Sequence, residues 1–150
     1  MDELELVELA SCRMKVIAAL LCDAASIRES LLSVLGAGIT HLRREEFPTA
    51  LSSFFAGLIE YDASDVESDH YIEVRIARVE GAEEVEVVNV RGELERLEQT
   101  ALPNSVATLP FAVDLQSAEI DAPGDYYIAV KIDGAEGMRV RFTATQVSNS

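Results

Sequence analysis

Four segments alternate apolar and polar residues at every second position, and this pattern constrains the fold more than any other feature. The segments span 71–79, 84–90, 126–132 and 138–144. Successive side chains of a β-strand point to opposite faces, so a period of two predicts strands with one face in a core and the other in water. Gly81-Ala82 separates the first two segments, and Asp133 to Gly137 separates the last two. We therefore expect two β-hairpins.

Further short apolar segments, separated by residues typical of turns, lie at 15–22, 31–44, 47–61 and 106–115. The first is apolar at both parities, which is typical of a central strand covered on both sides, although periodicity alone also permits a helix. Residues 23–30 and 91–105 are expected to be connections, each with room for one helical turn. The sequence thus predicts a mainly β fold. We expect an immunoglobulin-like or similar antiparallel β-sandwich of seven to eight strands, with at most one or two short helices.

The residues before the penultimate predicted strand sharpen this expectation. The segment Asp121-Ala-Pro-Gly124-Asp-Tyr126 is similar to the tyrosine corner of immunoglobulin-like sandwiches. In such a corner a tyrosine near the start of a strand turns its hydroxyl back to the backbone just upstream. We therefore expect Tyr126, Gly124 and Gly134 to have structural roles, the last of them in the turn of the final hairpin.

The chain has 150 residues, the length of one domain, and 49% of them are apolar, enough for a continuous core. We expect a single sandwich domain over 14–147, an acidic arm or extra edge strand over 1–13, and a tail at 148–150. The first residues are acidic, unlike a secretory signal, and no apolar run approaches the ~20 residues of a membrane span. These features predict a cytoplasmic protein.

Charge restricts the classes of partner. The chain carries 12 basic and 27 acidic residues, a formal net charge of −15. Proteins that bind nucleic acid need a cationic footprint for the phosphate backbone, and anionic membrane surfaces attract basic segments. We therefore expect neither a nucleic-acid partner nor a membrane partner.

A family resemblance rests on two segments. The first is Met14-Lys-Val-Ile-Ala-Ala-Leu-Leu-Cys-Asp23, followed by the glycine-containing strand through Gly36; the second runs from Pro123 to Gly134. Together they resemble a family of small bacterial proteins of unknown function, over residues 14–145. The resemblance implies a one-domain bacterial cytoplasmic protein without assigned chemistry, and it transfers no catalytic residue.

The sequence contains none of the common motifs for catalysis. There is no GxSxG nucleophile motif and no HExxH zinc motif, and Cys12, Cys22, His41 and His70 share no ligand spacing. Both cysteines are expected to be reduced thiols, and both histidines to face solvent or lie at an edge of the sandwich. We expect no catalytic residue, no cofactor and no enzymatic activity.

Loop carboxylates provide an alternative function. Calcium prefers several oxygen ligands, and some β-sandwiches gather aspartates at one loop end to bind it. The candidate ligands are Asp62, Asp65, Asp69, Asp121 and Asp125. A solvated acidic turn explains the same residues without a metal. The alternative to be tested is a ligand-binding sandwich for calcium or a small polar metabolite.

The segment 51–59 suggests assembly. It contains Leu51, Phe54, Phe55, Leu58 and Ile59, with only serine, alanine and glycine between them. Both faces of such a strand need cover, one from the core and the other from a helical link, the N-terminal arm or a second subunit. We therefore expect a non-enzymatic protein-interaction or structural subunit, with these five residues at an interface and a homodimer as the candidate assembly.

Overall fold

The computed structural model describes residues 14–94, 97 and 106–148. Over these residues the fold is mainly β, as the alternating segments predicted, with one 3-10 helix, η1 (Ala63–Asp65). The twelve strands are β1 (Lys15–Cys22), β2 (Ala24–Arg28), β3 (Leu31–Leu35), β4 (His41–Arg44), β5 (Thr49–Ala50), β6 (Phe54–Asp62), β7 (Tyr71–Glu80), β8 (Glu83–Glu93), β9 (Val106–Asp114), β10 (Glu119–Ile120), β11 (Gly124–Ile132) and β12 (Ala135–Gln146). The strands outnumber the seven to eight expected because several are very short.

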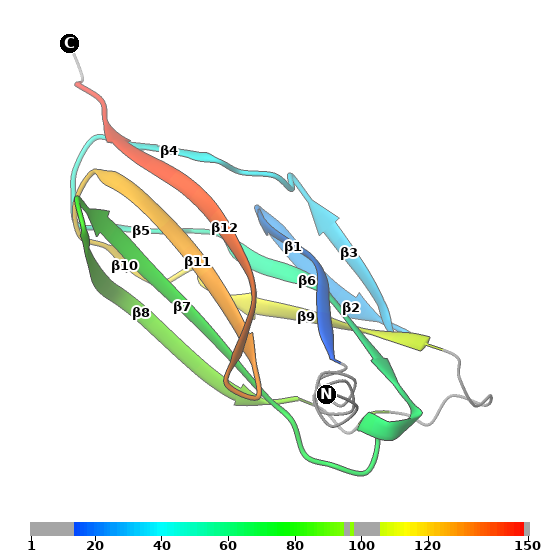
Figure 1. The fold of residues 1–150 in the computed structure, drawn as a ribbon. Coiled ribbons are helices and arrows are strands. Elements are labelled where there is room, and N and C mark those ends of the chain that lie inside the picture. The colour runs from blue at the N-terminus through cyan, green and yellow to red at the C-terminus, as the bar shows by residue number, and fades with distance from the viewer. Residues whose placement is uncertain (1–13, 95–96, 98–105, 149–150) are drawn as a thin grey trace.

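The strands form four sheets (Figure 1). The largest has the order β4-β12-β11-β7-β8, a second has the order β1-β6-β9, and β10-β5 and β2-β3 are two-stranded. Both expected hairpins, β7–β8 and β11–β12, are present and adjacent in the five-stranded sheet. One pairing departs from the expected antiparallel pattern, because β4 lies parallel to β12.

The β11–β12 hairpin follows from its turn. Only Asp133 and Gly134 lie between the two strands, with φ angles of 51° and 86°. A two-residue turn with positive φ at both positions matches the twist of the flanking strands, and aspartate and glycine tolerate that conformation. Gly134 thus occupies a turn position that favours glycine, in keeping with its expected structural role.

The two larger sheets share one hydrophobic core. The three-stranded sheet contributes Leu21, Phe55, Ile59 and Phe111, and the five-stranded sheet contributes Val74, Ile76, Ile128, Val130 and Phe142. Val74 and Ile76 alternate with the polar residues of β7, as the period of two requires. The alternating face therefore fixes which side of the five-stranded sheet is buried.

Two expectations for the first strands were wrong. β1 is an edge strand of its sheet and not a central one, and Ile17 lies at a bulge with 45% of its surface exposed. The following residues form the β2–β3 hairpin where a connection with a helical turn was expected. Glu29 and Ser30 make its two-residue turn, with φ angles of 52° and 61°. The alternation of apolar and polar residues is short in this hairpin, so little in the sequence indicated its two strands.

The position of β6 corrects the prediction for 51–59. β6 lies between β1 and β9, faces the five-stranded sheet across the core, and contacts the β2–β3 hairpin. Leu51, Phe55 and Ile59 are fully buried within the chain, so they are not available to a second subunit. Phe54 and Leu58 point to the other face of β6 and are half-buried. The chain itself therefore covers three of the five residues predicted at an interface.

Candidate functional site

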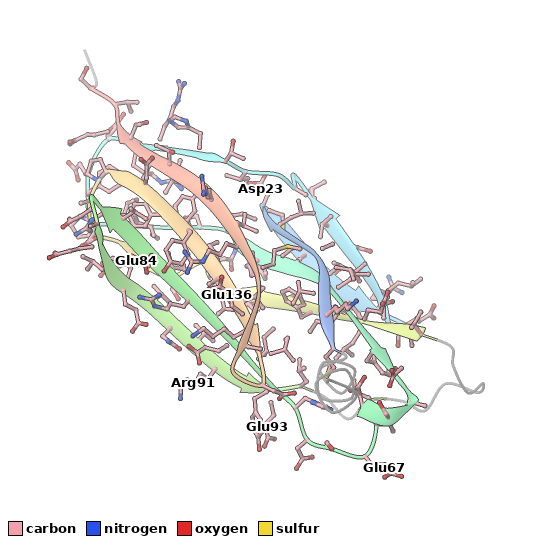
Figure 2. All side chains as sticks on the ribbon, viewed as in Figure 1. Asp23, Glu67, Glu84, Arg91, Glu93 and Glu136 are labelled. Carbon is pink, nitrogen blue, oxygen red and sulfur yellow. The ribbon has the colours of Figure 1, made fainter. Side chains whose placement is uncertain are left out.

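The candidate calcium ligands fall into two separate groups. Asp62, Asp65 and Asp69 precede Tyr71, the first residue of β7, whereas Asp125 is paired with Val79 near the other end of that strand. Eight residues of strand separate the groups, roughly 25 Å. Glu67 marks the first group in Figure 2. Within the described residues, no three His, Cys, Asp or Glu side chains are placed to hold one metal ion.

Each group of carboxylates has local partners. Asp62 and Asp65 form a capping box around η1, in which the Asp62 N–H donates to Asp65 Oδ2 at 2.9 Å. In the other group, Asp121 pairs with Arg78, and Thr143 donates to Asp125 at 2.9 Å. The Arg78 guanidinium lowers the pKa of Asp121, although burial opposes this. These contacts are those of structural turns.

His70 ties the segment after η1 to the turn of the β11–β12 hairpin. Its Nδ1 lies 2.6 Å from Asp133 Oδ2, and its Nε2 lies 2.7 Å from the backbone oxygen of Asp65. A carboxylate and a carbonyl both accept, so only the protonated ring, in which both nitrogens donate, can make both hydrogen bonds at once. Burial lowers the pKa of His70, but the hydrogen bonds to Asp133 and Asp65 outweigh it and the net pKa is raised. His70 is therefore a structural tie, with only 11% of its side chain exposed.

The His70 tie predicts a pH-dependent stability. A histidine whose pKa is raised on folding contributes stability that is fully present below its unfolded pKa of about 6.5 and is lost as pH rises through the folded pKa. We expect the wild type to lose about 1 kcal/mol of unfolding free energy between pH 5.5 and 8.5, the contribution of one hydrogen bond. Urea titrations should show this loss in the His41→Asn control and not in His70→Asn. An equal loss in both variants would contradict the assignment.

Tyr126 ties the start of β11 to the preceding loop. Its hydroxyl donates to the carbonyl of Ala122, four residues upstream, and accepts from the Ala122 N–H at 3.4 Å. The ring is 1% exposed and stacks on Phe142 at a centroid distance of 5.1 Å. Burial raises the pKa of the Tyr126 hydroxyl, against its hydrogen bond from Arg78. Gly124 begins the strand at a φ of 149°, a backbone conformation that favours glycine.

Tyr126→Phe is expected to lower the unfolding free energy by about 1 kcal/mol. The substitution keeps the stacked ring but leaves the Ala122 carbonyl without this donor. Tyr71→Phe is the matched control, because Tyr71 is 52% exposed and loses little on substitution. Urea titration of both variants measures the difference, and equal stability of the two would refute the role given to the hydroxyl.

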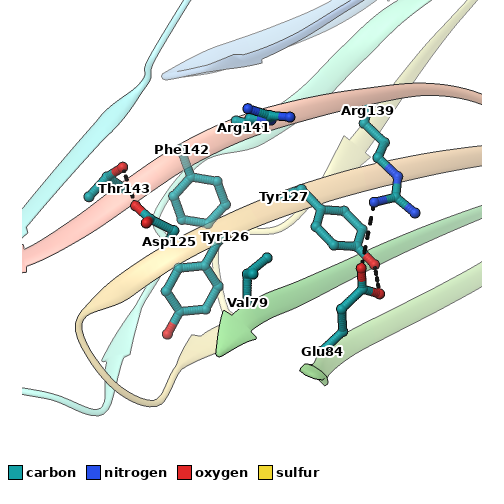
Figure 3. Close-up of a pocket in the computed structure, with 9 residues that line it drawn as sticks. All are labelled: Val79, Glu84, Asp125, Tyr126, Tyr127, Arg139, Arg141, Phe142 and Thr143. Carbon is teal, nitrogen blue, oxygen red and sulfur yellow. Dashed lines mark hydrogen bonds and ion pairs between the residues drawn. The ribbon is translucent and has the colours of Figure 1, made fainter. Parts of the chain in front are cut away.

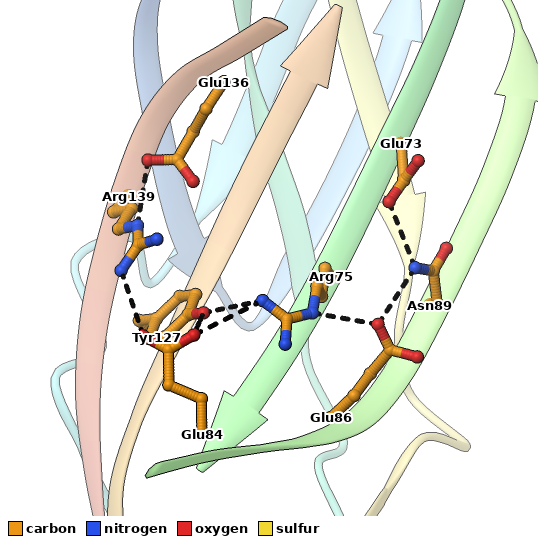
Figure 4. Close-up of polar contacts among 8 residues, drawn as sticks. All are labelled: Glu73, Arg75, Glu84, Glu86, Asn89, Tyr127, Glu136 and Arg139. Carbon is orange, nitrogen blue, oxygen red and sulfur yellow. Dashed lines mark hydrogen bonds and ion pairs between the residues drawn. The ribbon is translucent and has the colours of Figure 1, made fainter. Parts of the chain in front are cut away.

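On the opposite face of the five-stranded sheet, charged side chains form a row across four strands (Figure 4). Tyr127 is central: its hydroxyl donates to Glu84 Oε2 at 2.5 Å and accepts from Arg75 Nη1 at 2.7 Å. Arg139 lies over its ring, with the guanidinium carbon 4.1 Å from the centroid, a cation–π contact. Arg75 also donates to Glu86 at 2.9 Å. The row therefore alternates in sign and binds the strands to one another.

The pKa shifts of the row follow from these contacts. The hydrogen bond from Tyr127 lowers the pKa of Glu84, and Arg139 and Arg75 add to the effect. Burial raises the pKa of Tyr127, and the hydrogen bond to Glu84 raises it further. Because each of these charges has an oppositely charged neighbour, the row links the four strands through ion pairs and hydrogen bonds.

A shallow hollow of about 570 Å³ lies beside this row (Figure 3). Its lining residues are Val79, Glu84, Asp125, Tyr126, Tyr127, Arg139, Arg141, Phe142 and Thr143. Its two carboxylates are already hydrogen bonded, Glu84 to Tyr127 and Asp125 to Thr143. They are therefore engaged within the fold, so the loop-carboxylate alternative gains no support from this hollow.

The exposed apolar side chains of β2 and β3 form what we call the hairpin patch. Its members are Ile27 at 44% exposure, Leu31 at 70%, Val34 at 40% and Leu35 at 70%. By the register of the hairpin, Leu31 and Leu35 lie on one of its faces and Ile27 and Val34 on the other. Exposed apolar surface of this kind marks interaction sites. These four residues are not among those that the sequence predicted at an interface. The signal was the segment Leu31-Leu-Ser-Val-Leu35, which carries no charge in a strongly acidic chain.

The fold and these surfaces define a mainly β protein whose described part contains structural polar networks and an exposed apolar hairpin. The family comparison matches residues 17–145 to a family of unknown function (DUF6941), and the chain belongs to that family. The resemblance noted from the sequence is thereby confirmed. No match was found among curated proteins. Within the described residues, none of the helical structure is long and apolar enough to cross a membrane.

Two solved structures show distant similarity. A β-glucosidase from Listeria innocua in complex with gluconolactone has 12% identity and a TM-score of 0.40, with 88% of this chain and 16% of that chain covered. The alkylpurine DNA glycosylase AlkC from Pseudomonas fluorescens has 7% identity and a TM-score of 0.38, with 86% and 30% covered. This chain thus spans less than a third of either one, and at these scores the similarity carries no argument.

Proposed function

We propose that the chain is a non-enzymatic protein-interaction module or structural subunit of a bacterial cytoplasm. The proposal includes a single β-sandwich domain over 14–147, of immunoglobulin-like or similar type. The acidic arm or extra edge strand proposed for 1–13 lies outside the described residues. The core shared by the two larger sheets and the Tyr126 contact support the sandwich. The hairpin patch is the observation that carries the interaction function.

The energetics of the hairpin patch favour a protein contact. Burying a leucine side chain from full exposure gains about 1.5–3 kcal/mol, and both Leu31 and Leu35 retain 70% of their exposure. The hairpin, residues 24–35, contains one cation, Arg28, and one anion, Glu29. It is thus neutral in a chain of net charge −15, so long-range repulsion of an acidic partner is weakest here.

The proposal is tested by affinity capture from native cells with the full chain. The Leu31→Asp/Leu35→Asp variant should lose a protein that the wild type retains, since charges on the patch cannot be buried without cost. The matched control is Val106→Asp, which alters an apolar residue of 62% exposure outside the patch and should retain that protein. Identical capture by wild type and patch variant would refute the proposal. Circular dichroism verifies that all variants fold.

A further inference from the structure

β3 has an unprotected edge. It pairs with β2 on one side only, and no described strand pairs with its other side. Proteins usually protect such edges with charge or proline. Among the described edge strands of four or more residues, β1 carries Lys15, β2 carries Arg28, β4 carries Arg43 and Arg44, β8 carries several glutamates, and β9 carries Pro110. β3 has neither a charged residue nor a proline, and it lies at the outer margin of the fold (Figure 1).

The hairpin turn determines which peptide groups of β3 are free. A two-residue turn makes its flanking residues, Arg28 and Leu31, a hydrogen-bonded pair. Hydrogen-bonded and non-hydrogen-bonded pairs alternate along an antiparallel ladder. The peptide groups of Leu31, Ser33 and Leu35 therefore point to β2, and those of Leu32 and Val34 point to the free edge.

We propose that two copies of the chain associate through β3, paired antiparallel about a two-fold axis at Ser33. This inference rests on the proposed interaction function and names its partner. In this register Leu32 lies opposite Val34 of the partner subunit, and the free peptide groups of both exchange hydrogen bonds. The two hairpins then form one four-stranded sheet. A two-fold contact of this kind is self-complementary and closed, so it gives a dimer and not a fibre.

The same register brings the most exposed leucines together. Ser33 lies opposite the partner's Ser33, and Leu31 lies opposite the partner's Leu35. These are non-hydrogen-bonded pairs, in which the side chains of opposing residues are closest. Leu31 and Leu35 are each 70% exposed and lie on one face of β3. Each half of the two-fold contact therefore pairs one Leu31 with one Leu35. No other register about a two-fold axis pairs both leucines while it also satisfies the free peptide groups.

The distribution of charge favours contact between two copies at the edge of β3 over contact at other surfaces of the chain. Two chains of −15 repel each other, but each contributes a hairpin with no net charge. Salt screens the remaining repulsion beyond ~8 Å at physiological ionic strength. The dimer should therefore persist or become tighter as salt increases.

Site-specific disulfides test the register in the full chain with Cys12→Ser, since Cys22 is buried. Ser33→Cys places two thiols on the axis, with Cα atoms about 4.5 Å apart, within the range that a disulfide spans. The matched control is Ser26→Cys, because Ser26 is the exposed cross-strand partner of Ser33 but lies on β2. In the proposed sheet its two copies are about 14 Å apart. Mild oxidation should give a covalent dimer with Ser33→Cys and leave Ser26→Cys monomeric.

Sedimentation of the wild type at tens of micromolar should show a dimer from low to high salt, and Leu31→Asp should convert it to a monomer. A wild-type monomer throughout, or equal cross-linking of Ser33→Cys and Ser26→Cys, would overturn the β3 pairing. If the pairing fails while the patch variant still loses a captured protein, the partner is a different protein and the proposed function stands. If the pairing fails and capture is unchanged, both proposals fall.

Discussion

Gly57→Ala is expected to lower the free energy of unfolding by about 3 kcal/mol. Gly57 lies in the middle of β6, and a Cβ atom there would lie 2.0 Å from the Ala18 carbonyl oxygen and 2.7 Å from the Phe111 ring. Neither neighbour can yield cheaply, since one is backbone of the adjacent strand and the other is a core aromatic ring. Forcing extra atoms into a packed core costs about 1–3 kcal/mol and sometimes more. Urea titration measures the loss.

Gly92→Ala is the matched control for this prediction. Gly92 also lies in a strand, β8, but no atom would approach its added Cβ within 4 Å. Neither glycine has a positive φ, so the comparison isolates packing from backbone strain. The control should change stability by less than about 0.5 kcal/mol. Similar stabilities of the two variants would show that the close approach of β6 to β1 is wrong.

Phe55→Ala is expected to cost about 3–5 kcal/mol, because it removes a large buried side chain and leaves a cavity. Phe55 is fully buried, and its ring lies 5.9 Å from that of Phe111 in the shared core. The variant should unfold at a much lower urea concentration than the wild type. Its oligomeric state should not change while it remains folded, since Phe55 faces the core.

Phe54→Ala, one residue earlier, serves as the control. Phe54 is half-buried and points to the opposite face of β6. Its substitution should cost about 1 kcal/mol, in line with partial burial. If Phe54→Ala proved the more costly of the two, the assignment of the two faces of β6 would be reversed.

The candidate surfaces were less predictable than the strands. The sequence placed Tyr126 near a loop backbone, and the hydrogen bond to Ala122 is found there. It also grouped Asp62 and Asp121 as candidate ligands of one ion, whereas the structure separates them by most of the length of β7. Loop sequences have no periodicity, so they do not indicate at which end of a sheet a loop residue lies. Their proximity depends on how many strands intervene and in which direction each strand runs.

The sequence alone determined the features that depend on neighbouring residues. The alternation in 126–132 and 138–144 specified strands and their buried faces, and Asp133-Gly134 specified the turn between them. These patterns are local because side-chain direction and turn conformation are properties of a few consecutive residues.

Only the tertiary structure decided which elements cover one another. The apolar pattern of 51–59 required cover on both faces, but nothing in it distinguished a second subunit from the strands of the chain itself, within which Leu51, Phe55 and Ile59 are fully buried. The parallel pairing of β4 with β12 joins residues about a hundred positions apart in the chain. Such pairings depend on the free energy of the whole packed core. The sequence therefore could not show that β3 pairs on one side only, which the order of the strands in the sheets makes evident.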